Sequence, residues 1–153
     1  MAGRIHLQEA GSSRAVGLWL LACAGMVFVM VVLGGVTRLT GSGLSMVEWQ
    51  PLTLLPPLTE AAWQAEFARY QASPQYQLVN PFMTPADFKA IFWLEYAHRL
   101  WGRLIGAAVA GPLVGFLLAG RIGWRLAGWL LGLLLLGAAQ GALGWYMVAS
   151  GLI

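Results

Sequence analysis

An unbroken run of 22 uncharged residues, from Ala15 to Val36, constrains this chain more than any other feature of its sequence. A bilayer core of about 30 Å needs roughly 20 helical residues, so the run is long enough to cross a membrane. A cleaved signal peptide is the alternative, because Arg4 and Arg14 precede the run. The run is longer than the apolar part of a signal peptide, roughly 7 to 15 residues, and no small-residue cleavage site follows it. A transmembrane helix is therefore favoured.

Two further apolar segments follow. The uncharged run 104–120 has 17 residues, and its helical pattern extends back through Ile91, while the third segment is 126–153. Only 10% of the 153 residues are charged and 59% are hydrophobic, whereas soluble domains carry about 25% charged residues. We therefore expect an all-α, polytopic membrane helix bundle with three transmembrane helices.

The arginines set the expected orientation. Arg4 and Arg14 precede the first helix, and Arg121 and Arg125 lie between the second and third, which indicates that these segments are cytoplasmic. We expect a single membrane domain over 1–153, with the N-terminus cytoplasmic. Its predicted parts are a tail (1–14), helix one (15–36), an outer segment with short amphipathic helices (37–88), helix two (89–120), a cytoplasmic link (121–125), helix three (126–149) and a truncated outer end (150–153).

The outer segment shows helical signals of its own. Between Thr59 and Gln71 the aromatic residues Trp63, Phe67 and Tyr70 recur at helical spacing, which predicts an amphipathic helix on the membrane surface or capping the bundle. Prolines interrupt the pattern before and after it, around 51–57 and 74–81.

The second membrane helix has a predicted start outside the bilayer. Thr84 is placed as an N-cap, with Pro85 at the first helical position and Asp87 three residues beyond the cap, as in a capping box. A helix from Pro85 to Ala119 would be roughly 52 Å long at 1.5 Å per residue. It therefore has to begin outside the hydrocarbon core.

One face of this second helix carries the polar residues. At about 100° per residue, Glu95, His98, Arg99, Gly102 and Gly106 fall within one stripe roughly 100° wide. Ionisable groups inside a membrane are costly unless they face a bundle interior or a polar cavity. The spacing thus predicts that this face is turned away from lipid.

An axial haem ligand is one interpretation of this face. The imidazole of His98 could bind iron, glycines four and eight residues later would leave room for a flat ring, and Arg99 and Arg103 could pair with propionates. Composition and spacing alone favour the alternative, in which His98 is hydrogen-bonded to a neighbouring helix and Gly102 and Gly106 serve close helix packing.

Other site classes are less well supported. Glu95 and His98 have the Glu-x-x-His spacing of di-iron bundles, but no second copy of the motif is present. Cys23 is the only cysteine, which excludes an internal disulfide and a cysteine-based metal site. The cations are scattered rather than clustered, which argues against nucleic-acid binding despite a net charge of +3.

A long, ordered series of motifs resembles the heme A synthases of bacteria and mitochondria, most closely the branch without cysteines in the first outer loop. The resemblance covers nearly all of the chain after Ala15. It runs through GGVTRLTGSGLSMVEW (34–49), PPL (56–58), Phe67, Tyr70, PQY (74–76), FKAIFWLEYAHR (88–99), Gly102, Arg103 and the segment 141–151.

The resemblance implies an oxidoreductase that oxidises the C8 methyl group of heme O to a formyl group, with water as oxygen source, for cytochrome oxidase assembly. It implies eight helices in two four-helix halves, each with a histidine pair facing a haem, one half holding heme b and the other receiving heme O. His98 matches the first histidine of the N-terminal half, and Glu95 matches a functionally important glutamate. Arg38, Arg99, Arg103 and Gly102 fall in the matching haem-facing motifs.

The resemblance also leads us to expect that this chain is an N-terminal portion, ending before the helix that carries the partner histidine. The expected location is the bacterial inner membrane rather than the mitochondrial one. Expected partners are heme O, heme A, membrane lipid, heme O synthase, an electron-transfer partner and, through the glycine faces, a second copy. Two alternatives stay open: a non-enzymatic haem-binding subunit or b-type cytochrome assembly factor, and a purely structural bundle in which Glu95 only pairs with Arg99.

Overall fold

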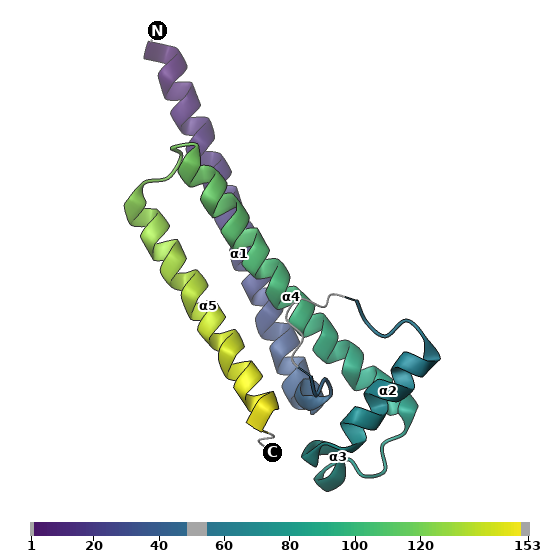
Figure 1. Ribbon diagram of the computed structural model, residues 1–153. Coiled ribbons are helices and arrows are strands. Elements are labelled where there is room, and N and C mark those ends of the chain that lie inside the picture. Colours follow the sequence, from purple (N-terminus) through teal and green to yellow (C-terminus); the bar gives the residue numbers. More distant parts are fainter. Residues whose placement is uncertain (1, 49–54, 151–153) are drawn as a thin grey trace. The chain divides into compact units, whose positions relative to one another are not determined.

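The structure, a computed structural model, describes residues 2–48 and 55–150, with side chains from Arg14 onward, and all regular secondary structure in these residues is helical. The elements are α1 (Ala2–Leu39), the 3-10 turn η1 (Ser42–Leu44), α2 (Glu60–Gln71), α3 (Pro74–Leu78), α4 (Pro85–Leu118) and α5 (Trp124–Ser150) (Figure 1). The predicted fold class is confirmed. Trp49, Pro51 and, apart from Ser150, the predicted outer end at 150–153 lie outside the described residues.

Three helices are long and apolar enough to cross a membrane: the part Arg14–Leu39 of α1, then α4 and α5. The predicted spans 15–36 and 126–149 lie inside α1 and α5, and the predicted span 89–120 overlaps α4. The helix α1 also continues back through the segment predicted as a tail, beginning at Ala2. This is therefore a membrane protein with three candidate spans in its described residues.

Local sequence signals account for the limits of α4. The capping box at its start is confirmed, since the Asp87 amide donates to Thr84 Oγ1 at 3.3 Å and the Thr84 amide donates to Asp87 Oδ2 at 3.2 Å. At its end Gly120 adopts φ +65°, and the Arg121 amide donates to the Phe116 carbonyl at 2.8 Å, as in a Schellman motif. Glycine suits this position because it tolerates positive φ.

The chain forms two compact units, which are described separately. The first comprises residues up to Met30 together with 102–139, and the second comprises 31–101 together with the residues from Gln140 onward. Each unit thus combines parts of α1, α4 and α5.

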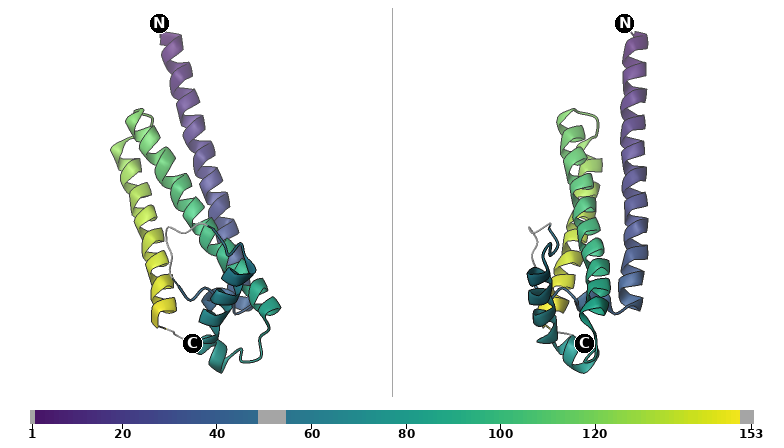
Figure 2. Two further views of the ribbon diagram at one scale, coloured as in Figure 1. Left: turned by 45° about the vertical axis from the view of Figure 1, so that its right-hand side comes forward. Right: turned by 90° about the vertical axis from the view of Figure 1, so that its right-hand side faces the viewer.

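The first unit has a small apolar core where α1, α4 and α5 meet. Trp19 and Phe116 lie beside this core with ring centroids 5.3 Å apart. Figure 2 shows the parts of α4 and α5 in this unit running antiparallel on either side of the link that joins them. The buried members of the core are Val16, Leu113, Ile122, Ala127 and Leu130.

A proline in α4 explains one contact of this unit. Pro112 has no N–H group, so it leaves the carbonyl of Ala108, four residues earlier, without its helical donor. The indole N–H of Trp19 on α1 donates to this carbonyl at 2.7 Å, and Cys23 Sγ lies 3.8 Å from it. In a membrane an unpaired carbonyl has no water to bond, so Trp19 compensates for the proline.

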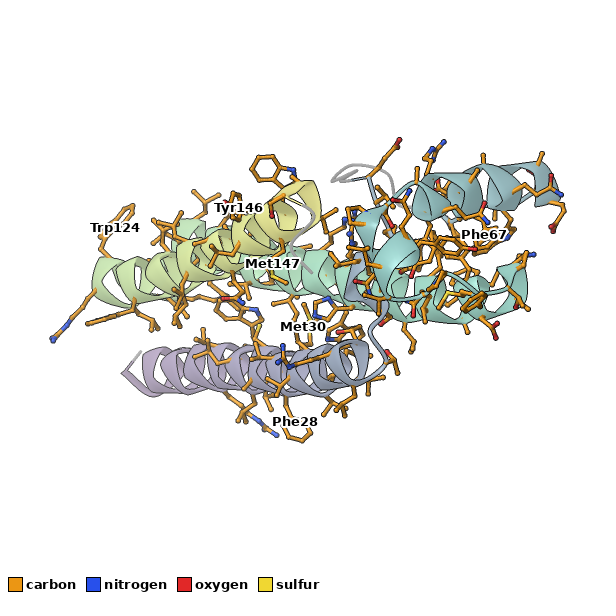
Figure 3. All side chains as sticks on the ribbon, turned by 90° about the horizontal axis from the view of Figure 1, so that it is seen from below. Phe28, Met30, Phe67, Trp124, Tyr146 and Met147 are labelled. Atoms are coloured by element: carbon orange, nitrogen blue, oxygen red, sulfur yellow. The ribbon has the colours of Figure 1, made fainter. Side chains whose placement is uncertain are left out.

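The second unit is organised around an aromatic cluster between α2 and the N-terminal end of α4. Tyr70 stacks on Phe88 at 5.1 Å between ring centroids, and Trp63 meets Phe92 edge-on at 4.9 Å. Figure 3 shows Phe67 among the side chains that fill the space between the two helices. The predicted helix with aromatic residues at helical spacing is confirmed, and its aromatic face packs on α4.

Tyr70 is the most deeply buried aromatic residue of the cluster, with no exposed surface. Burial raises the pKa of its phenol, and Asn80 Nδ2 donates to the phenol oxygen at 2.8 Å. Asn80 follows α3, a five-residue helix in a segment where the prolines predicted only a break. Ser73 caps α3 by accepting a hydrogen bond from the Tyr76 amide, and Pro74 occupies its first turn.

The glycine face predicted on the third membrane helix has no partner within the described part of the chain. A Cβ added at Gly137, Gly141 or Gly144 would meet no atom within 4 Å, and Gln140 is exposed. Packing through this face therefore stays a prediction.

Candidate functional site

The candidate site lies in the second unit, where the segment after α1 crosses the polar face of α4. Its central group is Glu95, whose residue is only 3% exposed. A buried carboxylate is costly unless charged or polar donors surround it. The groups that donate hydrogen bonds to Glu95 therefore define the candidate site.

Both oxygens of the Glu95 carboxylate accept hydrogen bonds. Oε2 accepts from the Ser45 hydroxyl and from the Met46 amide, each at 2.7 Å. Oε1 accepts from Arg99 Nε at 2.9 Å and also from Arg99 Nη2. The i,i+4 ion pair between Glu95 and Arg99, one of the alternatives left open by the sequence, is thus present.

Arg99 also bonds the segment that follows α1. Its Nη2 donates to the Met46 carbonyl at 2.9 Å, and its Nη1 donates to the Glu48 carbonyl at 3.2 Å. Glu95 and Arg99 together fasten residues 45–48 to α4. We call the segment Ser42–Glu48 the latch segment.

The fold of the latch segment depends on the turn that ends α1. Gly41 takes φ +63°, a conformation that favours glycine, and the 3-10 turn follows directly. The hydroxyl of buried Ser42 donates to the Thr37 carbonyl at 3.2 Å and lies 3.0 Å from the Thr40 hydroxyl. The turn is therefore tied back to α1 before the chain reaches Ser45.

Sequence reasoning missed Ser45 and Met46. Both belong to the GSGLSM motif, but nothing in the local pattern shows that a serine 50 residues before Glu95 bonds its carboxylate. The feature that marks Ser45 as having a specific role is its burial next to a glycine-rich turn, where it is 2% exposed. This burial is visible only in the structure.

His98 is half-buried one turn along α4 from Glu95. A Cβ built on Gly34 of α1 would lie 3.5 Å from His98 Nε2 and 4.0 Å from His98 Cδ2. A methyl group at position 34 would therefore be in ordinary van der Waals contact with the imidazole ring, and only a larger side chain would crowd it.

The donor set fits a haem better than a free metal ion. Among the described residues no three His, Cys, Asp or Glu side chains lie close enough to hold a metal ion. The porphyrin of a haem supplies four nitrogen ligands to the iron, so the protein has to supply only the axial ligands, which are often imidazoles. His98 offers one such imidazole.

The other predicted site residues divide between the two units. Arg38 lies in the last turn of α1 in the second unit and is exposed. Gly102 and Arg103 belong to the first unit, where Arg103 is half-buried. A Cβ at Gly102 would lie 3.1 Å from the Met30 methyl group, and Figure 3 shows Met30 directed from α1 toward α4. The packing interpretation of Gly102 therefore has a specific neighbour.

The second unit thus contains Glu95, His98, Arg99 and Arg38 of the predicted residues. Glu95 and Arg99 contact each other directly, and His98 lies between them in the sequence of the same helix. For Gly106, no atom lies within 4 Å of the position of an added Cβ. The predicted roles of all these residues stay predictions.

Comparison with known proteins decides the family. Residues 17–153 match the sequence profile of the COX15-CtaA family, described as cytochrome oxidase assembly protein. The chain belongs to this family.

Relatives of this COX15-CtaA member are named heme A synthase. The chain is 56% identical over 152 residues to the protein of Paramagnetospirillum magneticum, covering 99% of the chain and 43% of that relative. It is 54% identical over 144 residues to that of Azorhizobium caulinodans, covering 94% and 41%. Identity to heme A synthase COX15 of Arabidopsis thaliana is 55% over 137 residues, covering 90% and 30%. The chain thus spans less than half the length of these relatives, and no solved structure matches it.

Proposed function

We propose that this chain forms the haem-facing part of the N-terminal half of a heme A synthase, an enzyme that oxidises the C8 methyl group of heme O to a formyl group. The observation that carries the proposal is the buried Glu95 carboxylate, one helical turn from His98 on a helix of a protein whose relatives carry that name. Heme O is the proposed substrate here, and heme b is the proposed cofactor of the other half.

His98 is the proposed axial ligand in this half. A haem held by His98 would supply redox-active iron. The neutral imidazole would offer a nitrogen lone pair for the ligand bond.

Glu95 is the proposed catalytic residue. Its oxygens already accept bonds from Ser45, Met46 and Arg99, so its carboxylate is held in one orientation. A fixed negative group of this kind stabilises positive charge that develops at an oxidised carbon. The saturation of its oxygens favours electrostatic stabilisation over proton acceptance.

The arginines have different proposed roles. Arg99 bonds Glu95 and the latch segment through Nε, Nη1 and Nη2, which leaves little of its guanidinium for a haem propionate. Arg103 in the first unit is a proposed propionate partner, because a guanidinium binds carboxylates through a planar fork. Arg38 in the second unit is proposed, on the resemblance alone, as a cofactor-binding residue. Gly102 is proposed to keep the polar face of α4 free of a side chain at its position.

The proposal extends to location and partners. The enzyme would lie in the bacterial inner membrane with its N-terminus in the cytoplasm, as the arginine distribution predicts. It would receive heme O from heme O synthase and pass electrons to an electron-transfer partner. A homo-oligomer would use the glycine face of α5, which is uncovered in the described residues.

The competing function is a non-enzymatic haem-binding subunit. The ion pair of Glu95 with Arg99 is compatible with it, because a purely structural Glu95 would make the same contact. Both functions use His98 to bind haem, and they differ only in whether Glu95 is needed for oxidation.

The test is Glu95→Gln in the intact natural protein, expressed in a bacterial strain that lacks its own heme A synthase. We expect the haem absorption spectrum to persist while heme A, measured by chromatography and normalised to haem-containing protein, falls to background. His98→Ala should reduce the haem signal itself. The control is Glu60→Gln, which removes an exposed carboxylate paired with Lys89 at 3.0 Å and should leave heme A unchanged. An undiminished heme A yield in Glu95→Gln would refute the catalytic role and favour the haem-binding subunit.

A further inference from the structure

The latch segment contains a buried serine that the proposed reaction does not use. Ser45 is 2% exposed, yet its side chain is polar and its hydroxyl lies 2.7 Å from Glu95 Oε2 and 3.3 Å from the Ile91 carbonyl. The shorter distance and the charge of the carboxylate identify Glu95 as the main acceptor. Packing alone does not require a hydroxyl at this position.

We propose that Ser45 is a positioning residue, which fixes the Glu95 carboxylate from the latch segment and so determines where its charge lies. This inference rests on the proposed role of Glu95 in heme A formation. Ser45 would not touch the substrate and would act through Glu95 alone.

The arrangement around the carboxylate supports this role. Ser45 and the Met46 amide hold the Oε2 edge, while Arg99 holds the Oε1 edge. The two edges are thus held from different segments, one from the latch segment and one from α4. A carboxylate held at only one edge could rotate about its side-chain bonds, whereas one held at both edges cannot rotate without breaking charge-assisted hydrogen bonds.

Arg99 connects the Glu95 carboxylate to the latch segment. It bonds Glu95 and also the carbonyls of Met46 and Glu48, so the same guanidinium holds both the carboxylate and the segment that carries Ser45. The Ser45 hydroxyl, Glu95 and Arg99 therefore depend on one another. Loss of the hydroxyl should loosen the segment and leave the Oε2 edge of the carboxylate held by the Met46 amide alone, while His98 keeps its place against Gly34.

The first arm of the test measures the latch segment directly by amide hydrogen exchange in the intact natural protein, with no dependence on haem chemistry. In Ser45→Ala the peptide over 45–48 should exchange about tenfold faster or more, since a hydrogen bond to a charged group is lost. In a Glu95→Ala background, where no carboxylate remains to be held, Ser45→Ala should add little. Glu95→Leu, whose side chain offers no acceptor to the Ser45 hydroxyl, serves as the background if Glu95→Ala does not accumulate.

The second arm measures heme A and the haem spectrum in the same variants. Ser45→Ala should lower heme A per haem-containing protein about tenfold with the haem spectrum retained, and Ser45→Thr, which keeps a hydroxyl, should restore product. The matched control is Ser42→Ala, which removes another buried hydroxyl of the latch segment that bonds Thr37 rather than Glu95. It should retain heme A formation.

The outcomes separate this inference from the proposed function. Unchanged exchange and unchanged heme A in Ser45→Ala would overturn the role of Ser45 and leave heme A synthesis standing. Equal loss of product in Ser45→Ala, Ser45→Thr and Ser42→Ala would also overturn it, because any change in the segment would then be disruptive. Absence of heme A with the unaltered protein would refute the proposed function. In that case, faster exchange in Ser45→Ala that disappears in the Glu95→Ala background would still support the hydrogen bond between Ser45 and Glu95.

Discussion

Replacing Trp19 by phenylalanine tests how the first unit tolerates a proline inside a membrane helix. The change keeps an aromatic ring next to Phe116 but removes the indole N–H that bonds the Ala108 carbonyl at 2.7 Å. That carbonyl lacks its helical donor because residue 112 is proline. The expected result is a less stable protein with an unchanged helix arrangement.

The magnitude follows from the environment of the carbonyl. Hydrogen bonds between membrane helices contribute about 0.6 kcal/mol on average and up to about 1.7 kcal/mol. The Ala108 bond should lie in the upper part of this range because the carbonyl loses its main donor, although Cys23 Sγ at 3.8 Å offers a weak replacement. We therefore expect Trp19→Phe to lower the free energy of unfolding by about 1 to 1.5 kcal/mol.

The decisive measurement is a double-mutant cycle with Pro112→Ala, read by reversible unfolding in detergent or lipid. Alanine at position 112 restores an N–H group that can bond the Ala108 carbonyl within α4, so Trp19→Phe should then cost less than about 0.5 kcal/mol. A coupling free energy near zero would refute the reasoning, because the loss in Trp19→Phe would then come from ring packing. Trp129→Phe, a change at an exposed tryptophan on α5, is the matched control and should have little effect.

Two glycine substitutions test the space around the site. Gly34→Val should displace the His98 ring and weaken haem binding about tenfold, because overpacking costs about 1 to 3 kcal/mol, whereas Gly34→Ala places a methyl group at an ordinary 3.5 Å and should bind normally; equal haem titrations for both variants would contradict this geometry. Gly102→Ala should change the free energy of unfolding by less than about 1 kcal/mol, since the Met30 methyl group at 3.1 Å is the flexible end of its side chain and alanine favours the helix. A loss above about 2 kcal/mol would mean that Met30 cannot move.

Local signals in the sequence were sufficient for the three membrane-capable helices and for the start of α4. Length and hydropathy predicted the three membrane-capable segments, and the capping residues Thr84 and Asp87 predicted where α4 begins. These features depend on neighbours within one or two turns, so they are legible along the chain. The continuation of α1 back to Ala2 and the short helix α3 were not predicted, because neither segment has the long apolar pattern on which the other predictions relied.

The candidate site was predictable only in part. Helical spacing placed Glu95, His98 and Arg99 on one face of α4, and the i,i+4 ion pair was among the alternatives considered. The partners of that face come from elsewhere in the chain: Gly34 lies against His98, and Ser45 bonds Glu95 across 50 positions of sequence. Such contacts depend on how the turn after α1 returns to α4, which no local pattern encodes.

The sequence by itself determined that this chain is a membrane helix bundle with an ionisable face on its second long helix, because bilayer thickness and helical periodicity are read directly from residue order. Only the tertiary structure decided what that face contacts. Glu95 is buried, and a buried charge requires hydrogen-bond donors. Ser45 and Met46, in the segment that the fold brings next to α4, supply these donors together with Arg99 of α4 itself.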